Sequence, residues 1–235
     1  MRRRHDSILE KGPIQLAKET NTFWLASRGI WAESYAPWHG ALFGLLEPVN
    51  AASALFGLGI YTDMAVDAPV HLRSLGLHAV TAINLISSCY AHASANALAC
   101  WADRRSLIWA TSWELAFIIH RAAARAELHM ASAVGLVLLG SWCVPVELGF
   151  ACGLFVAEYV HYNGLDASSG ASVADLELIS EHAAAGARLI LLASCFWLFD
   201  RLSHIWPVCG HAFWHVICAA GCGRLTTAIA LSHTT

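Results

Sequence analysis

Near the C-terminus the sequence runs Cys209-Gly210-His211-Ala212-Phe213-Trp214-His215-Val216-Ile217-Cys218. His211 and His215 stand four residues apart in this apolar stretch, so a helix presents both imidazoles on one face. Two imidazoles on one face can share a metal ion, a common use of the His-x-x-x-His pattern. The alternative is a pair of interior histidines whose hydrogen bonds are satisfied by the protein. Ligands elsewhere in the chain decide between the two interpretations.

The composition indicates a membrane protein. Of the 235 residues 57% are hydrophobic and only 13% are charged, whereas soluble domains carry about 25% charged residues. Apolar windows of membrane-spanning length recur along the chain, which favours an integral, multi-pass protein. The net charge of −3 comes without a basic stripe, which argues against a nucleic-acid partner. No obligate protein partner is evident.

Seven windows predict an all-α fold, a bundle of seven transmembrane helices. Residues 1–36 form a polar N-terminal tail, and residues 37–235 form the seven-helix catalytic domain. The tail holds six Lys and Arg residues, and this bias predicts a cytoplasmic N-terminus. The windows cover about 38–60, 75–92, 98–119, 128–144, 145–162, 183–199 and 207–231.

Candidate partners of the histidine pair lie at the second and third windows. Ser88 and His92 share a helix face because they are four residues apart, and Asp103 follows eleven residues later. A carboxylate in an apolar segment is costly and indicates a functional site. In a seven-helix chain the second helix ends where the third and seventh begin. We therefore expect five residues at one membrane depth: Ser88, His92, Asp103, His211 and His215.

Three histidines with a carboxylate and a hydroxyl match a catalytic zinc site, which has three protein ligands and an open fourth position. Zinc lowers the pKa of its bound water to about 7, a carboxylate can take the water's proton, and a hydroxyl can stabilise an oxyanion. Each residue has a simpler alternative. His92 could be a packed helix-end residue, Ser88 could bond its own helix, and Asp103 could pair with a neighbouring arginine.

The same set of residues resembles the alkaline ceramidases, in particular a bacterial-type member. These are seven-helix intramembrane zinc hydrolases in a superfamily with the adiponectin/progestin receptors. Residues 46–53, with Glu47-Pro48, resemble the family's Glu-x-x-Asn segment, and residues 31–35 resemble its acidic Trp-Cys-Glu motif. Asp200-Arg201 precedes the histidine pair much as an Asp-Arg does in the family.

The resemblance implies a zinc-dependent amidase that hydrolyses ceramide to a sphingoid base and a fatty acid. It implies that His92, His211 and His215 bind zinc and that zinc-bound water attacks the amide carbonyl. Asp103 would activate this water, and Ser88 would stabilise the tetrahedral oxyanion. The substrate is a membrane lipid.

Two further assignments concern calcium and substrate. The family's eukaryotic members hold calcium near the first helix, and here Glu33 and Glu47 could contribute ligands. The family's Asp ahead of the Trp is Ile30 in this chain, which removes one of the several oxygens that calcium needs. Asn84, one turn before Ser88, could line the substrate site.

Other functions compete with this hypothesis. A Schiff-base receptor is disfavoured, because the only lysines are Lys11 and Lys18 in the tail. A receptor that shares the zinc bundle without turnover stays open, as does a hydrolase of another lipid amide or ester. A haem carrier could use His92 and His211.

Overall fold

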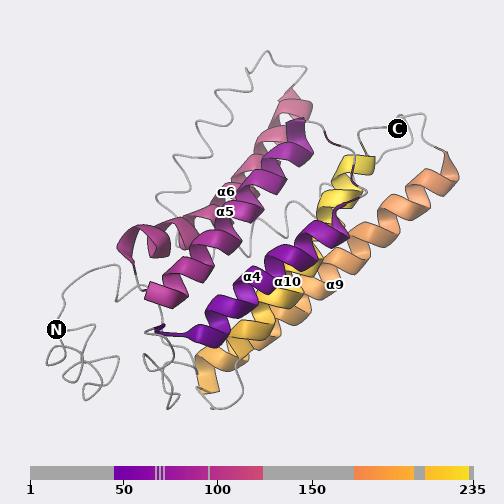
Figure 1. The fold of residues 1–235 in the computed structure, drawn as a ribbon. Coiled ribbons are helices and arrows are strands. Elements are labelled where there is room, and N and C mark those ends of the chain that lie inside the picture. The colour runs from indigo at the N-terminus through magenta and orange to yellow at the C-terminus, as the bar shows by residue number, and fades with distance from the viewer. Residues whose placement is uncertain are drawn as a thin grey trace, which may run out of the picture.

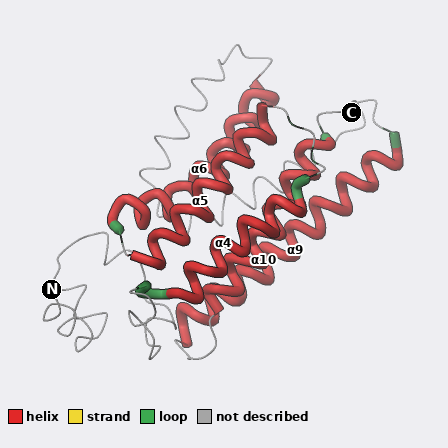
Figure 2. The backbone as a smooth tube through the Cα atoms, in the orientation of Figure 1, coloured by secondary structure: helices red, strands yellow, loops and turns green. Residues whose placement is uncertain are grey.

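The computed structural model describes residues 45–123 apart from 67, 69, 71 and 95, and residues 172–203 and 210–232. These residues form helices and contain no strand, which confirms the all-α expectation for this part (Figures 1 and 2). The predicted tail with Glu33 and the predicted fourth and fifth helices lie outside the described residues. The helices are α4 (Pro48–Met64), α5 (Leu72–Ser94), α6 (Ala97–Ala123), α9 (Val173–Ser203) and α10 (Gly210–Leu231).

The helices pack in the spatial order α9, α10, α4, α5, α6, and α10 also contacts α5. Successive neighbours along the chain are antiparallel, whereas α4 and α10 run in the same direction (Figure 1). The end of α5 and the beginnings of α4, α6 and α10 therefore lie at one end of the packed helices (Figure 1). The sequence predicted this shared end for α5, α6 and α10, and the structure confirms it.

α4 begins later than its apolar window. The first helical residue is Pro48, a position that suits proline because the first backbone N–H of a helix has no intrahelical partner. The two preceding residues bond the last turn of α5 instead. Leu46 N–H donates to the Ala93 carbonyl at 3.1 Å, and Glu47 N–H donates to the His92 carbonyl at 3.0 Å. The expected helical start near residue 38 is thus wrong for residues 45–47, and these bonds satisfy carbonyls at the end of α5.

α9 begins at Val173, ten residues before the window expected from about 183. Its first turn is closed by a reciprocal cap. Asp175 N–H donates to Ser172 Oγ at 3.2 Å, and Ser172 N–H donates to Asp175 Oδ2 at 3.3 Å. Hydropathy located the apolar part of this helix, whereas the capping pair sets its actual beginning.

Two of the described helices are long and apolar enough to cross a membrane. They are α9 over Val173–Asp200 and α10 over Gly210–Leu231. A buried core helix of a soluble protein meets the same criteria, so length and composition alone are a weak indication.

Candidate metal centre

The first turn of α10 is held by the end of α9. Asp200 Oδ2 accepts a hydrogen bond of 2.6 Å from the His211 backbone N–H, so a carboxylate from another helix caps this one. Gly210 makes the approach possible. A Cβ at this position would lie 2.6 Å from the Phe196 carbonyl oxygen and 2.9 Å from Asp200 Cβ. The cap therefore fixes where the helix that carries His211 and His215 begins.

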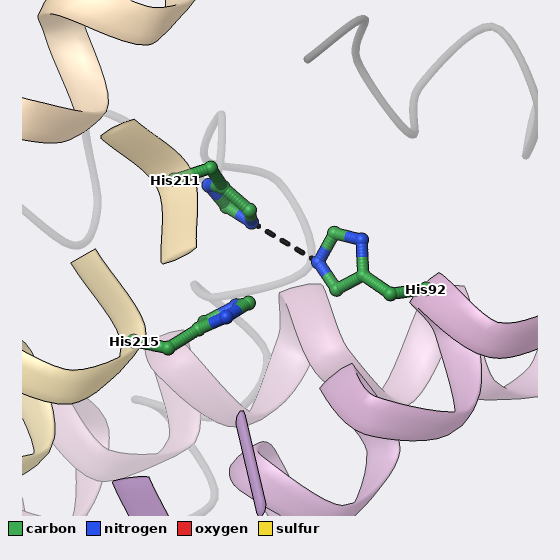
Figure 3. Close-up of side chains that lie close together, drawn as sticks. All are labelled: His92, His211 and His215. Atoms are coloured by element: carbon green, nitrogen blue, oxygen red, sulfur yellow. Dashed lines mark hydrogen bonds between the residues drawn. The ribbon is translucent and has the colours of Figure 1, made fainter. Parts of the chain in front are cut away.

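Three imidazoles converge beside this turn. His92 projects from α5 toward His211 and His215 of α10 (Figure 3), and the ligand atoms of the three residues lie within 4.8 Å of one another. The Nε2 atoms of His92 and His211 are 3.0 Å apart. The three side chains are buried, with exposed fractions of 3%, 6% and 4% in sequence order. The convergence predicted from the sequence is confirmed.

The arrangement fits a metal ion. Zn–N bonds of about 2.0–2.1 Å in a tetrahedron place the ligand nitrogens about 3.3 Å apart. Here two of the nitrogens are 3.0 Å apart, and all the ligand atoms lie within 4.8 Å of one another. Imidazole binds zinc, copper, iron and nickel. The three histidines could therefore hold a metal ion.

Glu47, the residue before α4, forms a hydrogen bond with the His92 ring. Its Oε2 lies 2.5 Å from Nδ1 of His92 and accepts a weaker bond of 3.4 Å from Asn50 Nδ2. A carboxylate accepts, so Nδ1 of His92 carries the proton and its Nε2 lone pair faces the other two rings. Glu47 contacts a candidate metal ligand, and its possible contribution to a calcium site stays a prediction.

Two hydroxyls contact the His215 ring, one at each nitrogen. Ser88 Oγ lies 3.0 Å from Nε2, and Ser53 Oγ lies 2.9 Å from Nδ1. Ser88 was predicted to lie beside the histidines, and the structure places it there, buried between α5 and α10. Ser53 was missed, although it follows Asn50 by three residues, a spacing that puts both side chains on one face of α4.

Asn84 and Asp103 form a second contact between α5 and α6. Asn84 Nδ2 donates to the Asp103 carbonyl oxygen at 2.9 Å and to Ser106 Oγ at 3.0 Å, and its distance to Asp103 Oδ1 is 3.4 Å. Asn84 was expected to line the substrate site. It ties the Asp103 turn of α6 to α5, one helical turn from Ser88, and its contact with a substrate stays a prediction.

In the part of the chain that the structure describes, the fold is all-helical and holds a buried three-histidine group at one end of its packed helices. Comparison of the chain with protein-family models, curated proteins and solved structures gave no match.

Proposed function

We propose that this protein is a seven-helix intramembrane zinc amidase that hydrolyses ceramide to a sphingoid base and a fatty acid, with its N-terminus in the cytoplasm. One observation carries the proposal. Three buried imidazoles from α5 and α10 lie within reach of one ion, and the Ser88 hydroxyl touches the same group. The resemblance of this residue set to the alkaline ceramidases supplies the substrate class.

Bound zinc would supply a Lewis acid for the amide carbonyl and a hydroxide at neutral pH. The protein's own residues would stabilise the oxyanion, transfer the proton and orient the ligands. Ser88 would donate its hydroxyl proton to the oxyanion that develops on the carbonyl. Asp103 would take a proton as general base, and Asn84 would hold the turn that carries it. Glu47 would keep the proton of His92 on Nδ1, so that Nε2 remains a ligand.

The distribution of side chains supports a lipid environment. Polar and charged residues such as Glu47, Asn50 and Asp200 are buried between the helices, whereas large apolar residues face outward. Soluble monomers rarely expose wide apolar patches, and such patches mark membrane or protein contacts. Exposed residues of this kind occur on α4, α5 and α9: Leu55, Phe56, Ile83, Ile86, Leu191, Leu192, Leu198 and Phe199.

Purified full-length protein tests the proposal by two measurements, metal content and release of fatty acid from a fluorescent ceramide. We expect about one zinc per chain, as a three-histidine catalytic site implies. His211→Ala should lose both the zinc and the hydrolysis. His182→Ala is the matched control, because His182 lies on α9 beside Arg224 and away from the site; it should keep both.

Other outcomes identify the alternatives. Full zinc occupancy without hydrolysis of any lipid amide or ester would overturn the amidase and favour a receptor. Release of fatty acid from another lipid amide but not from ceramide would overturn the substrate class. Equal zinc in the wild type and His211→Ala would remove His211 from the ligands.

A further inference from the structure

α4 carries none of the three histidines, yet its Ser53 contacts one of them. Ser53 Oγ lies 2.9 Å from His215 Nδ1 and 2.8 Å from the Asn50 carbonyl oxygen of its own helix. Ser88 Oγ lies 3.0 Å from the opposite ring nitrogen, Nε2. The two hydroxyls therefore bracket the imidazole of His215 from two helices.

The protons of these contacts can be assigned. The Asn50 carbonyl oxygen only accepts, so the single hydroxyl proton of Ser53 is directed to it. Ser53 Oγ is then an acceptor toward the ring, and Nδ1 of His215 must carry a proton and donate it. The lone pair of this neutral tautomer is on Nε2, the nitrogen that faces Ser88 and the other two rings. A chain of two hydrogen bonds thus leaves the metal-facing nitrogen unprotonated.

A close approach of α4 and α10 makes this contact possible. A Cβ at Gly57, one turn after Ser53, would lie 3.0 Å from the His215 carbonyl oxygen and 3.3 Å from Ala219 Cβ. Small residues let two helices pack at short distance. The short side chain of Ser53 reaches the ring only because the helix axes are this close.

We propose that Ser53 is a positioning residue for the metal centre, which fixes His215 as the Nδ1-protonated tautomer and aims its Nε2 at the ion. The inference rests on the proposed zinc site but does not depend on ceramide as the substrate. Partners of this kind orient metal-bound histidines, and their loss typically lowers metal affinity about 10- to 100-fold.

The test is the zinc affinity of the full-length protein, measured by competition with a chromophoric chelator. Ser53→Ala should weaken zinc binding about 10- to 100-fold. Ser53→Thr keeps the hydroxyl, which in a helix can still bond a carbonyl one turn back, and should retain the wild-type affinity. Ser194→Ala is the matched control, because Ser194 is also half-buried and bonds the Ile190 carbonyl of its own helix at 2.8 Å. It should leave zinc binding unchanged.

A second measurement uses the wild type alone, so it stands even if a variant does not fold. Imidazole ¹⁵N spectra of the metal-free protein should show His215 protonated at Nδ1. Protonation at Nε2, or Ser53→Ala binding zinc as tightly as the wild type, would overturn the inference. Weaker zinc binding by Ser53→Ala in a protein that releases no fatty acid would support the inference and refute only the amidase.

Discussion

Glu47 Oε2 lies 2.5 Å from Nδ1 of His92. This contact joins the residue before α4 to the last turn of α5. The backbone N–H of the same Glu47 bonds the carbonyl of the same His92 at 3.0 Å. Two bonds between one pair of residues fix the position and the ring orientation of His92 together.

Replacement of Glu47 should therefore weaken metal binding. Glu47→Ala removes the acceptor of the Nδ1 proton, and we expect about a 10- to 100-fold loss of zinc affinity. Glu47→Gln keeps an acceptor oxygen without the charge and should lose less. Glu177→Gln, on the exposed side of α9, is the control. Chelator competition measures all three, and a Glu47→Ala protein with wild-type affinity would contradict the role.

Asp200 should matter for stability more than a surface cap does. Asp200→Ala leaves the buried His211 N–H without its acceptor, and we expect a loss of about 1–3 kcal/mol in the free energy of unfolding. Ser172→Ala removes the hydroxyl that accepts from the Asp175 N–H at the exposed start of α9 and should cost about 0.5–2 kcal/mol. Thermal unfolding in detergent compares the two variants. Equal stability of Asp200→Ala and the wild type would show that the cap contributes nothing.

The contact between α4 and α10 gives a prediction with a control on the same helix. Gly57→Val should destabilise the protein by about 1–3 kcal/mol through overpacking, because its side chain meets the backbone of His215. The zinc affinity of Gly57→Val should also fall. Gly59→Val meets nothing within 4 Å and should be neutral in both measurements. Equal behaviour of the two variants would argue against close packing at Gly57.

Asp103 and Asn84 should affect turnover without affecting the metal. As a general base, Asp103 is expected to contribute about 10²- to 10⁴-fold to the rate, and Asp103→Asn should lose a comparable factor in ceramide hydrolysis. Asn84→Ala should lower the rate by a smaller factor, since the Asp103 turn loses its tie to α5. Both variants should keep their zinc. Ser87→Ala, which removes a hydroxyl bonded only to α5 carbonyls at Ile83 and Asn84, should hydrolyse normally.

The positions of the three histidines were predicted better than the residues that form hydrogen bonds with their rings. His-x-x-x-His spacing and the alternation of helix directions placed His92, His211 and His215 at one end of the helices, and these are local or topological properties. The hydrogen-bond partners of the imidazole rings depend on how closely α4 packs against α5 and α10. The periodicity of a sequence does not predict this packing distance. Ser53 could have been found from its spacing to Asn50, which puts two polar side chains on one face of an apolar helix.

Helix ends were predicted least well, for a physical reason. The hydropathy of a segment reports where apolar residues gather, whereas a helix begins where its first N–H groups find acceptors. Pro48 and the Ser172–Asp175 pair set the starts of α4 and α9. Asp200 caps α10 from another helix, and the sequence next to Gly210 contains no sign of such a tertiary cap.

The two histidines that touch through Nε2 are 119 positions apart in the chain. The three-histidine group cannot assemble until α10, which supplies two of its three rings, has been synthesised and packed. An ion bound by all three imidazoles can therefore enter only after α10 has packed beside α4 and α5. Loss of α10 would leave His92 in place without the two imidazoles that complete the three-histidine group.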